Sequence, residues 1–454
     1  MILTILPVGW DKMPPIGISI LKNYRDDIKC MDLRADSKDF SNLFNNLKIS
    51  KMEVKKFLKN YSDSISYFHN SKKSYGITRW VVNEYMIKLL NEPNEDFNNL
   101  FHKIADRLND DIVGFSTWKG NLGISLNVAK ILHEKGIKTI FGGPGVLFPN
   151  ISKYDFVDAV CIGEGENIFK EMTEHLGEKK IWMSNDFVDM NKIPTPDYSD
   201  FNMNNYEYIG IESQRGCVNH CAYCNLREFP NKGEYRQKSI DNIIKEIKKL
   251  KKYNKPFFFC DNITNPNKER ITKLAQRLRE ENIKWTAEMF PNIDKDLAIL
   301  LKKSGCFQIK LGVESLSNHA LRKMNKNLKW DESIRSLKNL HDVGIITQPL
   351  FFFGFPTESI WDVFITLIRI FKYRKYIDQT GLGFYHLSYN SLVHKYPNNF
   401  IINLKNIDDE WCRINDMVPY EDNNKLKHLM TKEVIEFTKD FLYYEGKHPY
   451  SDWW

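Results

Sequence analysis

The chain begins with apolar, strand-like runs that alternate with amphipathic, helix-like stretches. Over residues 1–190, runs such as MILTILPV, DIVGFSTW and IKTIFGGPG are separated by patterns such as NLGISLNVAKILHEKG. Strands connected through helices form parallel sheets that helices cover on both faces. This part therefore predicts a doubly wound α/β domain. Aromatic, helix-like text over about 36–105 interrupts the pattern and is expected to be a helical insertion.

A second alternation follows the segment NKIPTPDYSDFN, whose prolines indicate a connection between domains. The runs YIGIESQRG, KPFFFCDN, IKWTAEMF, CFQIKLGVES and IITQPLFFFGFP each precede or follow helical text. About six such units predict a full or partial β/α barrel over 191–385. The less regular, aromatic remainder, 386–454, is expected to cover a substrate.

Composition and charge narrow the class of protein. The chain has 454 residues, 42% hydrophobic and 27% charged, which is enough for two or three globular domains. The net charge of +7 is spread along helices such as SIDNIIKEIKKLKKYN, so a nucleic-acid partner is not expected. No run of about 18 apolar residues occurs, and the start lacks the features of a signal peptide. We therefore expect a cytoplasmic protein without a membrane segment.

Three of the eight cysteines lie together in RGCVNHCAYC, as Cys217, Cys221 and Cys224. We call them the cysteine triad. In the reducing cytoplasm such a group indicates a metal rather than a disulfide. Three thiolates can bind three irons of a cubane cluster and leave the fourth iron open. Zinc usually takes a fourth ligand at a second spacing, and His220 lies too close to the thiols for that. Three unrelated core cysteines are the other alternative.

The remaining cysteines are scattered. Cys30, Cys161 and Cys306 lie in apolar text and are expected in the core. Cys260 ends an apolar run and could point into the barrel mouth, although packing in the core is favoured. Cys412 lies among charged residues in DDEWCRIND, which indicates either an ordinary surface position or a hydrogen-atom donor to a substrate radical.

The motifs ESQRGCVNHCAYC, LKKSGCFQIKLGVES and GIITQPLFFFGFPTES resemble the radical S-adenosylmethionine (SAM) superfamily. In the first half, VGFSTWKGN, GIKTIFGGPG and CIGEGE resemble strand ends of the cobalamin-binding domain found in one branch of that superfamily. The resemblance covers about 1–385 with gaps. It implies an N-terminal Rossmann-like domain of the cobalamin-binding type, then a partial (β/α)6 radical SAM barrel and a small C-terminal segment.

The resemblance also implies roles for single residues. The cysteine triad would bind a 4Fe-4S cluster whose open iron takes SAM. Tyr223 matches an aromatic position that faces the adenine, Glu314 and Ser315 match residues near the ribose or methionine of SAM, and Gly354 matches a glycine beside the adenine. Glu314 could instead be a surface carboxylate at a strand end, and Gly354 could serve only the turn before Pro356.

Glycine-rich turns carry the cobalamin hypothesis. We expect Gly142, Gly143, Gly163 and Gly165 on the carboxyl edge of the front sheet, where open α/β sheets bind ligands, and we expect that edge to face the barrel. The motif D-x-H-x-x-G, whose histidine binds cobalt in many cobalamin domains, does not occur in the sequence. A scaffold that binds no cobalamin is the alternative.

Together these features predict an enzyme that reductively cleaves SAM to a 5′-deoxyadenosyl radical and modifies an unactivated carbon. The resemblance implies an external electron donor such as flavodoxin or ferredoxin. The cobalamin-like strand ends favour cobalamin-dependent C-methylation of a peptide or other small-molecule natural product. A radical peptide epimerase that uses Cys412, and a non-catalytic iron-sulfur or nucleotide-binding module, are the alternatives.

Overall fold

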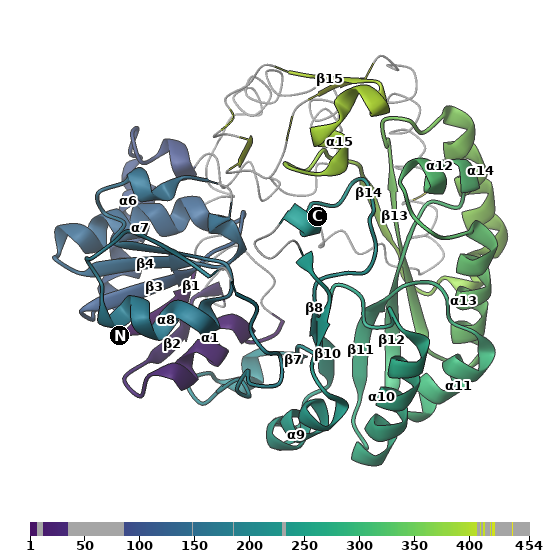
Figure 1. Ribbon diagram of the computed structural model, residues 1–454, viewed down its shortest axis with the longest axis horizontal. Coiled ribbons are helices and arrows are strands. Elements are labelled where there is room, and N and C mark those ends of the chain that lie inside the picture. Colours follow the sequence, from purple (N-terminus) through teal and green to yellow (C-terminus); the bar gives the residue numbers. More distant parts are fainter. Residues whose placement is uncertain are drawn as a thin grey trace.

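Two parallel-sheet units lie next to each other in the protein, and short C-terminal elements lie at one end of the second (Figure 1). The computed structural model describes residues 1–6, 12–34, 86–147, 149–184, 186–228, 233–405, 409, 412–413, 418, 420–422 and 438. Most of the expected insertion, 36–85, lies outside the described residues. The domain bounds 1–190, 191–385 and 386–454 stay predictions.

The front unit is a six-stranded parallel sheet in the order β2-β1-β3-β4-β5-β6. Because the chain places β2 and β3 on opposite sides of β1, a topological switch point lies between β1 and β3. The strands are β1 (Ile2–Ile5), β2 (Lys29–Asp32), β3 (Ile112–Ser116), β4 (Lys138–Gly142), β5 (Ala159–Ile162) and β6 (Ile181–Met183), and the described α-helices are α1 (Ile16–Leu21), α6 (Glu95–Arg107), α7 (Leu122–Glu134) and α8 (Gly165–Glu174).

Helix α6 shows how this unit builds its core. Asn94 caps the helix through its side chain, which accepts a hydrogen bond from the backbone N–H of Phe97. Phe97, Phe101 and Ile104 recur at helical spacing and are buried in the front core together with α7. The described end of the expected insertion therefore packs as part of the doubly wound unit.

The second unit is a six-stranded parallel sheet in the order β7-β10-β11-β12-β13-β14. Strands that neighbour one another in chain order, with helices between them, form an open partial barrel, and this confirms the predicted fold class. The strands are β7 (Ile209–Ile211), β10 (Phe257–Phe259), β11 (Trp285–Met289), β12 (Cys306–Glu314), β13 (Ile346–Phe353) and β14 (Gly381–Phe384), and the helices are α9 (Ile240–Leu250), α10 (Lys268–Glu281), α11 (Lys295–Lys303), α12 (Asn318–Lys323), α13 (Trp330–Asp342) and α14 (Ile360–Tyr373).

Alternation along these strands separates an apolar outer face from a polar inner face. Phe257, Phe259 and Trp285 are fully or almost fully buried in the core that the strands share with the helices. Side chains of the opposite parity point inward, and among them Gln308 donates a hydrogen bond to Gln348. The main hydrophobic core therefore lies outside the barrel, which leaves the strand ends and the interior for chemistry.

The segment between the two units is fixed to both. Tyr198 is fully buried in the barrel core, while the backbone N–H of Asp197 donates to the carbonyl of Ser19 at 2.9 Å. Lys22 of the front unit pairs with Asp200 at 2.7 Å. The predicted connection thus also holds the two units against each other.

The C-terminal elements cover the carboxyl ends of the barrel strands. They are α15 (Leu392–Lys395) and the antiparallel strands β15 (Ile402–Leu404) and β16 (Tyr420–Asp422). The backbone N–H of Val393 donates to the carbonyl of Ala222 in the cysteine region at 3.3 Å, and Asn225 donates to the carbonyl of Tyr389 at 3.1 Å. Among the helices in the described ranges, none is long and apolar enough to span a membrane.

Candidate active site

The cysteine triad lies in the segment that connects the two strands of a short antiparallel ribbon, and we call this segment the cysteine loop. The ribbon consists of β8 (Gln214–Arg215) and β9 (Arg236–Gln237). Gly216 has a φ of +79°, and a Cβ there would collide with the carbonyl oxygens of Gly233 and Glu234. A glycine is therefore required where the two ends of the cysteine loop meet.

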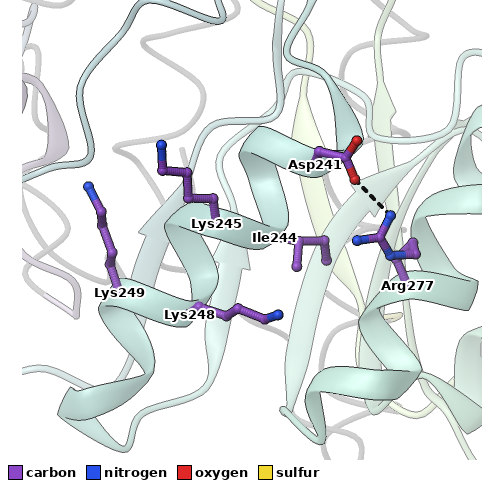
Figure 2. Close-up of a pocket in the computed structure, with 6 residues that line it drawn as sticks. All are labelled: Asp241, Ile244, Lys245, Lys248, Lys249 and Arg277. Atoms are coloured by element: carbon purple, nitrogen blue, oxygen red, sulfur yellow. Dashed lines mark hydrogen bonds and ion pairs between the residues drawn. The ribbon is translucent and has the colours of Figure 1, made fainter.

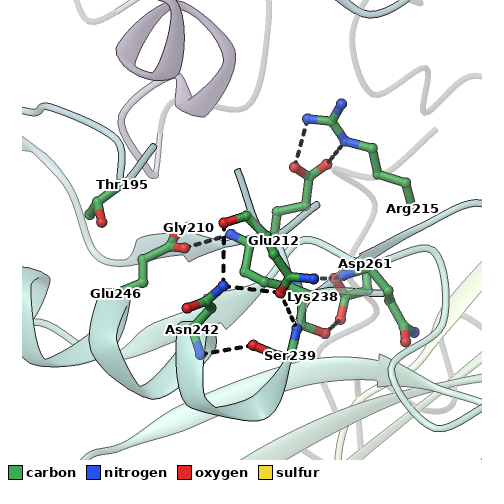
Figure 3. A network of polar contacts seen from close by, with 12 residues as sticks. Thr195, Gly210, Glu212, Arg215, Lys238, Ser239, Asn242, Glu246 and Asp261 are labelled. Atoms are coloured by element: carbon green, nitrogen blue, oxygen red, sulfur yellow. Dashed lines mark hydrogen bonds and ion pairs between the residues drawn. The ribbon is translucent and has the colours of Figure 1, made fainter. Parts of the chain in front are cut away.

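A buried carboxylate fixes the start of this loop. Asp261, just after β10, accepts hydrogen bonds from the backbone N–H of Ser213 at 2.8 Å, the hydroxyl of Ser213 at 2.5 Å and the backbone N–H of Gln214 at 3.1 Å. Figure 3 shows Asp261 in the polar network that also contains Glu212 and Arg215, whose side chains pair with each other. The end of β7 and the beginning of the ribbon are thereby held to the neighbouring strand.

The three thiols of the triad share one environment. The sulfur of Cys217 accepts a hydrogen bond from the backbone N–H of Asn219 at 3.4 Å, and that of Cys224 accepts one from Leu226 at 3.5 Å. Burial raises the pKa of Cys221, and burial raises the pKa of Cys224 to about 11, with a further rise from the other two thiols. Crowded thiols with backbone N–H donors fit a cationic cluster, because bound iron replaces the protons they would otherwise keep.

The triad is not arranged as the ligand set of one metal ion. Within the described residues, no group of three or more His, Cys, Asp or Glu side chains is close enough to hold a single ion. A cubane does not require such a group, since each cysteine binds a different iron.

Tyr223 and Glu314 meet beside the cysteine loop. The hydroxyl of Tyr223 donates to Glu314 at 3.2 Å, and its ring contacts Phe352 edge-on at 4.9 Å between centroids. Glu314 has a φ of +64° at a break in the register of β12 with β13. A left-handed conformation is uncommon at a glutamate and persists only where the surrounding structure holds it. Such residues cluster at functional sites. The surface alternative for Glu314 is wrong, because only 12% of its side chain is exposed.

Lys326 completes this group, and sequence reasoning missed it. Its ammonium donates to Glu314 at 2.7 Å and to the hydroxyl of Tyr223 at 3.4 Å, and only 5% of its side chain is exposed. Lys326 follows α12 in ordinary polar text, so nothing in its local pattern marks it. Its neighbour Asn325 donates to the carbonyl of His220, which ties this turn to the cysteine loop.

Ser315 and Gly354, the two other residues expected near SAM, do not belong to the group formed by Tyr223, Glu314 and Lys326. Ser315 is fully buried, and its hydroxyl lies 3.0 Å from that of Thr366 on α14, so the structure does not bring it to the cysteine loop. Gly354 has a φ of +86°, and its backbone N–H donates to Glu358 at 2.6 Å. A Cβ at Gly354 would meet nothing within 4 Å, so the turn conformation rather than crowding requires the glycine.

The four predicted glycines of the front unit lie at the end of β4 or just after β4 and β5, on the carboxyl edge of the sheet. A Cβ at Gly143 would lie 2.5 Å from the carbonyl oxygen of Thr117, and one at Gly163 would lie 2.9 Å from that of Ser184. Protein backbone therefore occupies the space beside these two glycines. Gly142 and Gly165 have only ordinary contacts at that position. Their role toward cobalamin stays a prediction.

This carboxyl edge faces the barrel, as expected. Glu164, directly after Gly163, lies 3.1 Å from Arg215 at the base of the cysteine loop. Farther along, His386 follows β14. Burial, together with the positive charge of Lys119 after β3, lowers the pKa of His386 to about 3. His386 is therefore neutral at physiological pH. The front sheet and the barrel strand ends thus border one junction.

The remaining cysteines divide as follows. Cys30, Cys161 and Cys306 are 2%, 8% and 1% exposed, which confirms the core prediction. The sulfur of Cys260 lies 3.7 Å from that of Met13 of the front unit. Cys412 is only 6% exposed, so the surface interpretation is wrong. It packs in the apolar cluster that covers the barrel strand ends, because the aromatic residues there outweigh its charged sequence neighbours.

A surface pocket of about 490 Å³ lies elsewhere (Figure 2). It is formed by α9 and α10 and is lined by Asp241, Ile244, Lys245, Lys248, Lys249 and Arg277. The lysines of the last turn of α9 lie toward the amino ends of the strands, since helices run antiparallel to the strands in such units. This basic pocket is therefore not part of the site around the triad.

Comparison with known proteins places the chain. Residues 211–367 match the model of the radical SAM superfamily, a range that includes the triad, Glu314 and Gly354. An uncharacterized methyltransferase of Pyrococcus horikoshii is 27% identical over 334 residues, which are 66% of this chain and 71% of that protein. Cytidylyl-2-hydroxyethylphosphonate methyltransferase of Streptomyces wedmorensis is 22% identical over 319 residues, 56% of this chain but only 59% of that protein.

Solved structures share the whole two-unit fold. The radical SAM methyltransferase TsrM of Kitasatospora setae, with tryptophan and a SAM analogue bound, has a TM-score of 0.64 at 12% identity over 96% of this chain and 88% of that chain. The cobalamin-dependent radical SAM enzyme OxsB, with aqua-cobalamin and SAM bound, has a TM-score of 0.63 at 14% identity over 97% of this chain and 67% of that chain. The match to the radical SAM superfamily model therefore covers the barrel, and a doubly wound domain lies in front of it.

Proposed function

We propose that the protein is a cobalamin-dependent radical SAM enzyme that methylates an unactivated carbon of a peptide or small-molecule natural product. The observation that carries the proposal is the junction itself: the carboxyl edge of the front sheet faces the cysteine loop, with Glu164 against Arg215. A methyl donor held at that edge is useful only within reach of a radical made at the cluster. The methyltransferases among the relatives support the same reaction.

Residues of the barrel divide the work around the cluster. The triad would hold a 4Fe-4S cluster, and Tyr223, Glu314 and Lys326 would border SAM. When bound, the cluster and SAM supply a 5′-deoxyadenosyl radical, and cobalamin supplies the methyl group. Lys326 neutralises the Glu314 carboxylate at 2.7 Å, so the pair can exchange hydrogen bonds with a polar ligand without exposing a lone charge. Gly354 leaves open space at the end of β13.

The C-terminal elements would keep water from the radical. Phe352, Phe355 and Tyr385 form one apolar cluster with residues of these elements over the strand ends. A closed, dry site limits side reactions of a reactive intermediate.

Cobalamin would lie at the carboxyl edge, bordered by the turns that contain Gly143 and Gly163. The chain lacks the D-x-H-x-x-G motif, so no histidine of that motif would bind the cobalt. Lys119 and His386, which interact electrostatically across the junction, would border the same space from the two units. A reduced flavodoxin or ferredoxin would supply the electron, and we place the reaction in the cytoplasm.

One observation keeps a radical epimerase as a second candidate. Cys412 belongs to the same apolar cluster as Ala222 of the cysteine loop and Phe352 of the barrel. A thiol at that place could return a hydrogen atom to a substrate radical. Such a reaction needs no cobalamin.

Two measurements test these proposals. Protein produced anaerobically with cobalamin supplied should retain a corrin absorption band after gel filtration, and with dithionite and SAM it should form 5′-deoxyadenosine. Absence of the corrin band would contradict cobalamin-dependent methylation, and absence of 5′-deoxyadenosine would favour a non-catalytic module. Cys412→Ala should leave 5′-deoxyadenosine formation unchanged. If the wild type transfers solvent deuterium to its product and the variant does not, the epimerase is correct.

A further inference from the structure

The ribbon that closes the cysteine loop contains an electrostatic conflict. Its register places Arg215 of β8 directly opposite Arg236 of β9. Like charges directly opposite each other destabilise an antiparallel pair. The ribbon has only two residues on each strand, so it has little else to resist the repulsion. Because Arg215 lies two positions before Cys217, opening of the ribbon would move the triad.

Glutamates of the front unit remove this conflict. Glu164 contacts both arginines: it lies 3.1 Å from Arg215 and accepts hydrogen bonds from both terminal nitrogens of Arg236. Glu166 lies 2.5 Å from Arg215. The third carboxylate that pairs with Arg215, Glu212, belongs to the barrel unit. Two of the three carboxylates at the ribbon therefore belong to the other unit.

These contacts are shielded from solvent. The exposed fractions of the side chains are 18% for Arg215, 17% for Arg236, 13% for Glu164 and 10% for Glu166. Charge pairs in such surroundings are screened far less than pairs on an open surface. Loss of one carboxylate would also leave an arginine poorly compensated, which costs more than loss of an exposed pair.

The glutamates are themselves held rigidly. Glu164 is the N-cap residue of α8, and Glu166 lies in its first turn, where the helix dipole favours negative charge. The backbone N–H of Val188 donates to Glu164 at 2.8 Å, while the carbonyl of Val188 accepts from Arg236 at 3.0 Å. Gly163, with a φ of +98°, directs the chain from β5 into this turn. The position of the arginines therefore follows the position of the front sheet.

We propose that Glu164 and Glu166 are positioning residues that clamp the cysteine loop from the front unit, so that the cluster and the ligand-binding edge of the front sheet move as one. The clamp goes beyond the proposed methyl transfer and does not require cobalamin. It assigns a function to the two glutamates of the turn GEGE, residues 163–166, where the sequence had drawn attention only to the glycines. Reactions of this kind tolerate little displacement, since a shift of about 1 Å can cost about 100-fold in rate.

The test uses full-length, anaerobically reconstituted protein and three variants. Glu164→Gln keeps the size of the side chain and removes its charge. Glu171→Gln, on the exposed side of the same helix, is the matched control. Glu164→Gln combined with Arg236→Gln removes both the carboxylate and the repulsion it relieves. The measurements are the EPR spectrum of the dithionite-reduced cluster with and without SAM, and hydrogen exchange of peptides from 213–238.

The clamp makes defined predictions. Glu164→Gln should retain iron but show a broadened cluster spectrum, faster exchange in 213–238 and about 10- to 100-fold slower formation of 5′-deoxyadenosine. The double variant should recover much of the exchange protection, because the two arginines no longer face each other. Glu171→Gln should match the wild type. A Glu164→Gln protein with the spectrum and exchange of the wild type would overturn the proposal, as would a double variant no better protected than the single one.

Two further outcomes are also decisive. If Glu164→Gln takes up no iron, Glu166→Gln replaces it, because it removes only the contact with Arg215, and an unchanged spectrum there overturns the clamp. If the wild type binds no cobalamin or forms no 5′-deoxyadenosine, the proposed function fails. The cluster spectrum and the exchange data then still decide whether the front unit positions the loop.

Discussion

Replacement of Asp261 by alanine would remove the acceptor on which the start of the cysteine loop depends. Asp261, Ser213 and Gln214 are 4%, 1% and 2% exposed, so water cannot replace the lost carboxylate without rearrangement. The substitution leaves two buried backbone N–H groups and one hydroxyl without their acceptor. Local opening at the end of β7 should therefore become much easier.

The magnitude follows from these contacts. A buried donor left unsatisfied costs about 1–3 kcal/mol, so two backbone donors cost about 2–6 kcal/mol. Local opening of that size should speed amide exchange at 213–214 by about 30-fold or more, since about 1.4 kcal/mol corresponds to a factor of ten. Hydrogen exchange of a peptide covering 209–216, measured by mass spectrometry, reports this directly.

Asp261→Asn is the matched control. Its carbonyl oxygen can still accept from both backbone N–H groups, and its amide can donate to the Ser213 hydroxyl, which rotates to accept. Exchange in this variant should stay close to that of the wild type. The reasoning is refuted if Asp261→Ala exchanges like the wild type, or if Asp261→Asn exchanges as fast as Asp261→Ala.

The stability of the wild type should depend on pH through Asp261, and that of Asp261→Asn should not. Burial raises the pKa of Asp261 to about 7, although the hydrogen bonds from Ser213 and Gln214 favour the ionised form. Between about pH 4 and pH 7 the folded protein therefore holds a proton that the unfolded chain has lost, so this group's contribution to stability falls as pH rises, by up to about 4 kcal/mol. Urea unfolding at several pH values should show this slope in the wild type and not in Asp261→Asn.

Three further predictions concern the two ligand sites. Replacing the whole triad with alanine should abolish bound iron and its broad absorbance, whereas Cys306→Ala, in the core, should retain both. Gly143→Ala should lower the melting temperature and weaken cobalamin binding because its Cβ meets backbone 2.5 Å away, whereas Gly142→Ala, with its nearest contact at 3.7 Å, should be tolerated. Lys326→Met should leave Glu314 without its cation and raise the SAM concentration needed for 5′-deoxyadenosine formation. Equal effects in Lys323→Met, on the exposed side of α12, would contradict that role.

Sequence alone determined the elements of this protein, because they depend on neighbours in the chain. The run CFQIKLGVE alternates in polarity and forms β12. The regular alternation of strands with helices favours parallel sheets, and both six-stranded sheets are parallel. The triad could also be recognised, since its three thiols lie within eight positions on one loop. Such features depend on periodicity and spacing, which a sequence states directly.

Tertiary structure decided which groups meet. Lys326 reaches Tyr223 from 103 positions away, and no local pattern distinguishes it from a solvated lysine. Ser315 and Glu314 are adjacent in sequence, yet the turn after β12 sends the hydroxyl of Ser315 toward α14 while Glu314 contacts Tyr223.

Two motifs were interpreted wrongly or incompletely from the sequence, also because long-range contacts decide their role. Cys412 has charged neighbours but packs among aromatic residues that the barrel strand ends supply. In GEGE the glycines attracted the interpretation, while the charges of Glu164 and Glu166 acquire their role only when the front unit meets Arg215 and Arg236. Burial and charge pairing are properties of a docked surface, and they are settled by long-range packing rather than by the residues on either side in the chain.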